Sequence, residues 1–396
     1  MQRRTDLLTD LSRGVRVGEY RIDATSGIRL AGTDAWSITA TTLRGGQSEG
    51  VDVVRIDNGR LAVEVLPTRG MGLRRGTCDG IELGWKSPVE FPVNPAFVEL
   101  GARGGLGWLA GFNEFLCRCG LEFNGPPGLD VITNNLGHRV EAPLTLHGKI
   151  ANIPAHAVSV EIDPADEGTL AITGVVDEAM LFGPNLRLRS TLSTQAGSNR
   201  LTIVDEVTNR GGVPAELQLL YHWNFGPPLL GAGASFVAPL RRVVPRDARA
   251  AETGERWNKY PAPIAGATEQ VYFLEPRADA QGRSLALLRD PSGTRGASIA
   301  FRVDELPCLT LWVNAQAEAD GYVTALEPGT SYPNFKAFER AEGRVVALAP
   351  GETRRFEVEL AVHSTPHDVE ATVAAIAAIA AAHPPAAIAP PLFGPE

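Results

Sequence analysis

The chain has 396 residues, a formal net charge of −9 and 21% charged residues, which fits one large β domain or two ordinary domains. The acidic balance and the lack of a Lys/Arg block argue against a nucleic-acid or anionic-membrane partner. No apolar run reaches about 18 residues, so no membrane-spanning helix is expected. The four cysteines form neither a disulfide framework nor a zinc spacing. We therefore expect reduced thiols and a cytoplasmic protein.

The predicted elements are mostly strands, after a short helix expected over residues 4–13. Runs in which apolar and polar residues alternate predict antiparallel sheet with one buried face. Turn signals rich in Gly and Pro separate these runs, and no repeat of fixed period is evident. The strand candidates, in chain order, are residues 61–67, 186–194, 201–207, 271–276, 298–303 and 355–362.

The C-terminal region predicts a different structure. Residues 366–383 form the best helix candidate, with Pro366 in the first turn and Asp368 suited to a helix N-terminus. Residues 384–396 are rich in proline and predict an extended tail, which we expect to dock on the body or on a partner, so a homodimer is one option. Residues 1–365 are predicted to form one all-β domain, a supersandwich of two large antiparallel sheets.

Four residues are the main candidates for chemistry. His222 lies in the apolar run LLYHWNFGPP, where a buried imidazole must find partners or lose its charge. Asn224 shares its face, because residues i and i+2 of a strand point the same way. His147 ends the run LTLH before Gly148, and Glu327 ends a strand at Glu-Pro-Gly. Taken singly, each also fits a structural role: a satisfied core histidine or a surface glutamate before a turn.

Other polar residues lie in apolar or Gly-rich settings, including Arg69, Arg118 and Asn314. Each of these alone fits a structural role better than a functional one. A metal site would require His138, His147 and Glu327 to converge, and this spacing is a weak signal. No phosphate loop or dinucleotide fingerprint is present, so no cofactor and no metal is expected.

Three segments occur together and in order: LTLHGK, LLYHWNFGPP and ALEPGT. With the segments RVGEYRI, LAVEVLPTRGMG, GGLGWLAGFNEFLCRCGLEFNG and PGETRRFEVEL, they resemble the aldose 1-epimerase (galactose mutarotase-like) superfamily over about residues 15–365. The chain is more similar still to a bacterial branch whose substrate is undefined. The resemblance implies a β-supersandwich, in agreement with the strand pattern, and a carbohydrate-active isomerase that needs no cofactor.

The resemblance also implies roles for individual residues. His222 matches the general acid, Glu327 the general base, and His147 a histidine that binds the sugar near the reacting centre. Arg69 or Arg118 would contact sugar hydroxyls, and Asn224 and Asn314 are further binding candidates. The family's hydroxyl-binding aspartate has no counterpart here, and Lys149 replaces its second glycine. The expected partner is a monosaccharide or a sugar acid.

Two other kinds of function stay open at this point. The fold also carries lyases and other epimerases, and a lyase would need a base such as Tyr221, Tyr322 or Tyr332. A non-catalytic sugar-binding protein is the other alternative. It would be favoured if Glu327 pointed away from His222.

Overall fold

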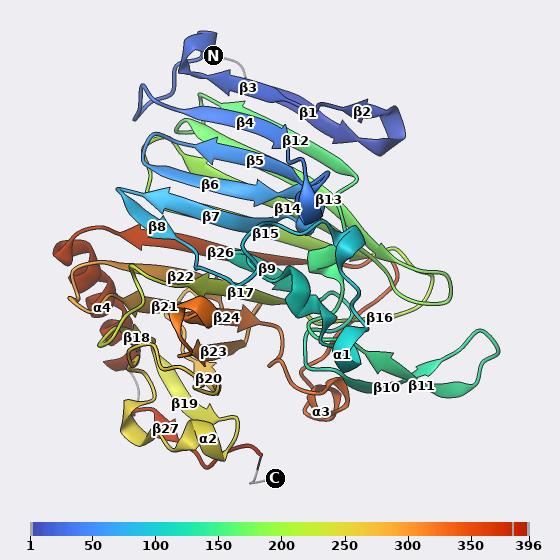
Figure 1. Ribbon diagram of the computed structural model, residues 1–396, viewed down its shortest axis with the longest axis vertical. Coiled ribbons are helices and arrows are strands. Elements are labelled where there is room, and N and C mark those ends of the chain that lie inside the picture. The colour runs from blue at the N-terminus through green and yellow to red at the C-terminus, as the bar shows by residue number, and fades with distance from the viewer. Residues whose placement is uncertain (1–2, 382–383, 394–396) are drawn as a thin grey trace.

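The computed structural model describes residues 3–381 and 384–393. Alternating burial along the strands builds two large sheets that pack face to face (Figure 1). The first sheet has 13 strands in the order β27-β19-β20-β23-β24-β17-β9-β7-β6-β5-β4-β3, with β8 paired to β7. The second has 10 strands in the order β18-β21-β22-β26-β15-β14-β13-β12-β1-β2. This arrangement confirms the predicted all-β supersandwich.

The strands of the 13-stranded sheet are β3 (Tyr20–Asp23), β4 (Ser37–Thr42), β5 (Asp52–Asp57), β6 (Leu61–Leu66), β7 (Gly72–Cys78), β8 (Ile81–Leu83), β9 (Leu116–Cys119), β17 (Leu220–Phe225), β19 (Leu240–Pro245), β20 (Gln270–Pro276), β23 (Cys308–Asn314), β24 (Val323–Gly329) and β27 (Ala387–Ile388). Those of the 10-stranded sheet are β1 (Arg4–Asp10), β2 (Val15–Arg16), β12 (Ala157–Asp163), β13 (Thr169–Ala179), β14 (Asn185–Gln195), β15 (Arg200–Asn209), β18 (Ser235–Val237), β21 (Arg283–Arg289), β22 (Gly296–Arg302) and β26 (Thr353–His363). Two small hairpins are β10 (Gly128–Thr133) with β11 (Arg139–Leu144) and β16 (Ala215–Leu217) with β25 (Val346–Leu348). The α-helices are α1 (Ala102–Gly105), α2 (Ala248–Ala251), α3 (Lys336–Ala341) and α4 (Pro366–Ala381).

The predicted N-terminal helix over residues 4–13 is wrong. Residues Arg4–Asp10 form strand β1, which pairs with β12, and only Leu11–Arg13 turn as a 3-10 helix. Sheet pairing buries Leu8 in the core, which a short isolated helix at this position would leave exposed. Asp10 then caps the turn by accepting hydrogen bonds from the backbone of Ser12 and Arg13.

The C-terminal helix α4 lies against the 10-stranded sheet, with Val369 and Ile376 packed on Leu287 of β21. The tail that follows adds β27 beside β19, the one parallel pair among the described strands. The predicted helix end at His383 and the last tail residues 394–396 lie outside the described residues. Within the part of the chain that is described, no helix is long and apolar enough to cross a membrane.

A buried polar network, here called the inter-sheet tie, connects the two sheets inside the core. Arg118 of β9 forms a bidentate ion pair with Asp205 of β15, and both side chains are fully buried. Tyr221 of β17 donates to the same carboxylate at 2.8 Å, and Arg118 also donates to Ser190 of β14. These bonds fix Arg118 of β9 and Tyr221 of β17 with their side chains pointing into the core. The adjacent residues of each strand therefore point outward, because successive side chains alternate between the two faces.

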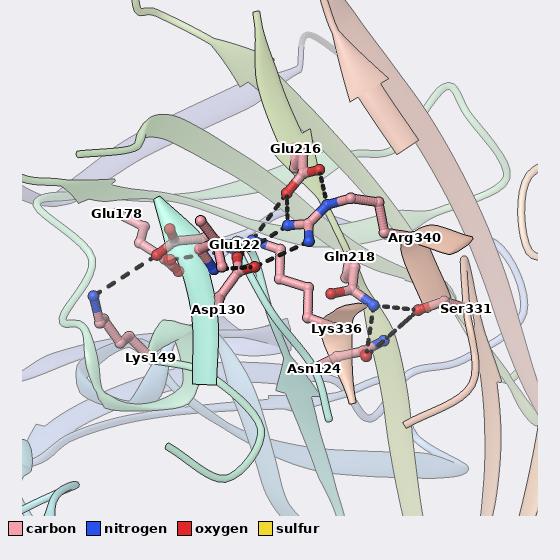
Figure 2. Close-up of polar contacts among 11 residues, drawn as sticks. Glu122, Asn124, Asp130, Lys149, Glu178, Glu216, Gln218, Ser331, Lys336 and Arg340 are labelled. Atoms are coloured by element: carbon pink, nitrogen blue, oxygen red, sulfur yellow. Dashed lines mark hydrogen bonds and ion pairs between the residues drawn. The ribbon is translucent and has the colours of Figure 1, made fainter. Parts of the chain in front are cut away.

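The β10–β11 hairpin projects from the body beside α3 (Figure 1). Asp130 of β10 holds it there through ion pairs with Lys336 and Arg340 of α3, and both cations also contact Glu216 (Figure 2). After this hairpin the chain returns to the face of the 13-stranded sheet that points away from the other sheet. His147 lies there, beside the end of β9.

Candidate functional site

The strand register brings several chemically active side chains into one row on the outer face of the 13-stranded sheet. His222 on β17 lies opposite Cys117 on β9. On its other side, Trp223 pairs with Leu326 and Asn224 with Ala325, which places His222 beside Glu327 of β24. Glu327 in turn lies opposite Thr310 of β23. Directly opposed residues share a face, so these four side chains point the same way.

His222 and Glu327 are in direct contact. His222 Nε2 lies 3.1 Å from Glu327 Oε1, and the two residues are only 4% and 2% exposed. Burial, with a smaller contribution from His147, lowers the pKa of His222 to about 3. Burial, with Cys119 and Glu269 nearby, raises the pKa of Glu327 well above its usual value. Both shifts favour a neutral pair over two separate charges.

Asn224 determines where the protons of this pair sit. Its amide nitrogen donates to the carbonyl oxygens of Glu114 and His222, so its oxygen is the atom that faces His222 Nδ1, at 2.7 Å. The oxygen can only accept, which requires a hydrogen on Nδ1. The second ring nitrogen, Nε2, then shares one proton with Glu327. The pair is either neutral histidine with protonated glutamate, or imidazolium with glutamate.

We expect Asn224→Leu to release the His222 ring from this tautomer. The substitution leaves a buried Nδ1–H without an acceptor, which should lower the free energy of unfolding by about 1–3 kcal/mol. Nitrogen NMR of the His222 ring should show a single Nδ1–H tautomer in the wild type and a mixture in the variant. Asn224→Asp keeps an acceptor oxygen and should preserve the wild-type tautomer. An unchanged ring spectrum in Asn224→Leu would contradict this role for Asn224.

His147 reaches the same site from the segment after β11. Its backbone has a left-handed φ of 59°, and the next residue, Gly148, has φ 71°. A Cβ on Gly148 would lie 2.4 Å from the Gly120 carbonyl oxygen, so only glycine permits this close approach to the end of β9. His147 Nδ1 donates to the Asn124 carbonyl at 2.8 Å. The Asn124 side chain accepts a hydrogen bond from Gln218 and donates one to Ser331 (Figure 2).

Cys119 adds a thiol beside His147. Burial opposes charge on both groups. At Cys119 a hydrogen bond from Cys117 and the attraction of His147 outweigh burial and lower the pKa of the thiol to about 6, and the attraction of Cys119 raises the pKa of His147. Cys117 and Cys119 share the outer face because they are two residues apart on β9. All four cysteines are free and buried.

Aromatic rings enclose the two histidines, whose own ring centroids are 5.7 Å apart. Trp108 packs edge-on against His147 at 4.8 Å, Phe112 against His222 at 5.3 Å, and Trp312 against His222 at 5.4 Å. Trp312 is partly exposed and donates to Glu269 at 2.8 Å. His147 is also partly exposed, so the site approaches solvent beside His147 and Trp312.

A separate cleft of about 310 Å³ lies nearby. Trp85 forms part of its wall and packs on Phe112 at 5.0 Å. Its other lining residues include Arg74, Lys86 and Asn113. Neither histidine of the site lines this cleft, nor does Glu327.

Three of the predicted sugar-binding residues have other partners. Arg69 is buried and bonded to Glu114, Asn152 and the Gly111 carbonyl. Arg118 faces the core, on the side of β9 opposite Cys117 and Cys119. Asn314 lies opposite Val323, four residues along β24 from Glu327, and donates to the Gly321 carbonyl. The structure thus gives Arg69, Arg118 and Asn314 partners within the protein, and their binding of sugar stays a prediction. Asn224 remains, as the residue that orients His222.

The residues named for the competing chemistries are not at the site. The hydroxyls of Tyr221, Tyr322 and Tyr332 donate to Asp205, to the Pro261 carbonyl and to the Leu274 carbonyl. His138 is exposed in the turn of the β10–β11 hairpin, at the end farthest from Leu144. Within residues 3–381 and 384–393, no three His, Cys, Asp or Glu side chains are placed to hold a metal ion.

Comparison with known proteins identifies the family of the chain. A family described only as a domain of unknown function, DUF4432, matches residues 48–362. A solved structure from Klebsiella pneumoniae, described as a candidate aldose 1-epimerase, is 35% identical over 98% of both chains, with a TM-score of 0.90. The chain belongs to the galactose mutarotase-like superfamily. A search of curated proteins found no match to the sequence.

More distant members of the superfamily share the fold alone. A galactose mutarotase-like protein from Clostridium acetobutylicum is 16% identical, with a TM-score of 0.58 over 87% of this chain and 99% of its own. The galactose 1-epimerase of Lactobacillus acidophilus is 12% identical, with a TM-score of 0.53 over 82% of this chain and 98% of its own.

Proposed function

We propose that this chain is an aldose 1-epimerase, which interconverts the α and β anomers of a sugar by opening and reclosing its ring. The observation that carries the proposal is the buried 3.1 Å contact between His222 Nε2 and Glu327 Oε1. The likeness to the Klebsiella pneumoniae protein supports the same reaction class. The contact also favours an acid–base pair over a purely sugar-binding role, for which Glu327 would point away from His222.

The two states of the pair match the two halves of the reaction. The resting pair is neutral histidine with protonated glutamate, and movement of the shared proton across the 3.1 Å contact to Nε2 gives imidazolium and glutamate. From that state, Glu327 takes the proton of the C1 hydroxyl while His222 gives a proton to the ring oxygen. The bond between C1 and the ring oxygen breaks, and an aldehyde forms. The pair is then protonated glutamate with neutral histidine. After rotation about C1–C2 the proton transfers reverse, and the ring closes on the other face of C1.

His147 and Asn224 would keep this chemistry in place. Asn224 fixes the His222 tautomer, so that Nε2 and not Nδ1 faces the reacting atoms. His147, held by the Asn124 carbonyl and next to Cys119, would hydrogen-bond the sugar beside the reacting centre. A small set of pre-positioned groups suffices, because the reaction moves only protons and one C–O bond.

Polarimetry tests the proposal on fresh solutions of single anomers. The panel is D-galactose, D-glucose, D-xylose and D-galacturonate, with the spontaneous rate in the same buffer subtracted. We expect wild-type protein to accelerate equilibration of at least one sugar in proportion to its concentration. If no sugar in the panel equilibrates faster than in buffer, the proposed activity is wrong.

The pH dependence of kcat/KM should follow the shared proton. His222 gains a second proton only near its lowered pKa of about 3, so activity should not decline as pH falls through 6.5. Glu327 has a raised pKa, so the pair should lose the proton shared between Nε2 and the carboxylate only at alkaline pH. The value of kcat/KM should decline there. An acid limb near 6.5 in a profile measured from pH 5 to 9, if Cys119→Ser retains it, would mean that His222 titrates as an ordinary histidine, which contradicts the shared-proton pair.

A further inference from the structure

Two buried donors in the site have no partner in the protein. Trp108 Nε1 and Thr310 Oγ1 are closed off from solvent, and no acceptor for either lies within the described residues. Their residues are both 1% exposed. Unpaired buried polar groups are rare because each loses its hydrogen bonds to water without replacement. Trp108 and Thr310 differ from the other unpaired groups Trp223 and Ser284 in lying beside the reacting pair, where a bound ligand would supply the missing partner.

Both donors adjoin the reacting pair. Thr310 lies directly opposite Glu327 in the β23–β24 register and shares its face. The Trp108 ring lies 4.8 Å from the His147 ring and 6.4 Å from the His222 ring. A ligand that contacts His147, His222 and Glu327 would thus lie beside both Trp108 and Thr310.

The charges around the site indicate what kind of ligand these donors take. An indole N–H can only donate, so Trp108 requires an acceptor oxygen. The nearby cations are already paired: Arg69 with Glu114, Arg246 with Glu269, and His147 with Cys119. Glu269 lies at the solvent side through its bond to Trp312 and would repel an anion. Neutral hydroxyl oxygens therefore suit this site better than a carboxylate.

We propose that Trp108 and Thr310 are substrate-binding residues that donate hydrogen bonds to hydroxyl oxygens of a neutral aldose. This inference rests on the proposed function for the identity of the ligand, but it concerns binding and not proton transfer. It selects neutral aldoses over sugar acids, a choice that the sequence left open.

The test measures sugar affinity in two variants that delete only the donor. Trp108→Phe removes the indole N–H and keeps an aromatic ring beside Phe112. Thr310→Val replaces the hydroxyl with a methyl group of similar size. We expect each to raise the Kd for the tightest-binding neutral aldose about three- to tenfold, as for loss of one hydrogen bond. The probes are D-galactose, D-glucose and D-xylose, with D-galacturonate as the anionic arm, titrated by NMR.

The chain provides matched controls for both substitutions. Trp223 also has a buried Nε1 without a partner, but its ring faces the core and packs on Phe115 at 5.3 Å. Ser284 has a buried, unpaired hydroxyl in β21, in the other sheet. Trp223→Phe and Ser284→Ala make similar chemical changes away from the site and should leave the Kd within twofold of wild type.

The outcomes separate this inference from the proposed activity. If Trp108→Phe and Thr310→Val are folded and bind the sugar as tightly as the controls, the two residues do not bind substrate, whether or not anomers interconvert. If the wild type binds D-galacturonate more tightly than every neutral aldose, or binds no neutral aldose at all, the ligand class is wrong. If the wild type binds neutral aldoses without interconverting them, and the two variants bind more weakly, this inference stands and only the proposed activity fails.

Discussion

Glu327→Gln should remove nearly all anomer exchange, lowering kcat/KM by about 10²–10⁴-fold, while the protein stays folded. The glutamine is close in size to the glutamate, and its amide can still donate to His222 Nε2 across the 3.1 Å contact. It cannot take a proton from the C1 hydroxyl, so the step that opens the ring loses its base. The measurement is polarimetry on the sugar that wild-type protein turns over fastest.

His222→Asn should cause a comparable loss, because it removes the group that protonates the ring oxygen. Glu19→Gln makes the same change as Glu327→Gln at an exposed position and serves as the control for the loss of a negative charge. The circular dichroism spectrum and the urea midpoint of each variant should stay close to those of the wild type. Full interconversion rates in both Glu327→Gln and His222→Asn would show that this pair is not the acid and base.

Arg118→Met should be the most destabilising single substitution considered, lowering the free energy of unfolding by about 3–5 kcal/mol. The change leaves the fully buried Asp205 carboxylate without its two-pronged partner, and a buried unpaired charge costs far more than a lost surface contact. Equilibrium urea unfolding measures the loss. A decrease below about 1 kcal/mol would contradict the role of Arg118 as the inter-sheet tie.

Two further variants isolate the cause of that loss. Arg118→Met combined with Asp205→Leu removes both charges and should recover much of the stability, because replacing a buried ion pair with apolar groups is often nearly neutral. Arg21→Met breaks an exposed ion pair with Asp23 and should cost no more than about 1 kcal/mol. Equal losses in the double variant and in Arg118→Met would point to packing instead of charge.

Much of the fold could be predicted from the sequence, because strand alternation is a local signal. The runs at 186–194 and 355–362 fall within β14 and β26, whose burial alternates as predicted. The structure of the N-terminal segment could not be predicted, because strand β1 forms only by pairing with β12, more than 140 residues away. The pairing of two strands depends on the whole sheet, so a short stretch of sequence does not reveal it.

The site also contains residues that local sequence reveals and residues that only strand pairing reveals. His147, His222 and Glu327 could be identified because each is a polar residue that ends or interrupts an apolar run. The alternation in LCRC implies that Arg118 faces away from Cys117 and Cys119, but it does not tell which side is the core. Thr310 carries no such signal, because only the β23–β24 register places it beside Glu327.

Two-dimensional exchange NMR on the anomeric protons of an equilibrated neutral aldose tests the central claim most directly. The method measures the interconversion rate of the two anomers at equilibrium. It needs no coupled enzyme and no change in the ratio of the anomers. With wild-type protein, we expect cross-peaks between the α and β signals whose build-up rate rises in proportion to protein concentration. The same amount of Glu327→Gln should leave the rate at that of buffer alone. A wild-type rate equal to the buffer rate for every aldose that binds, or an equal rate in Glu327→Gln, would contradict the account.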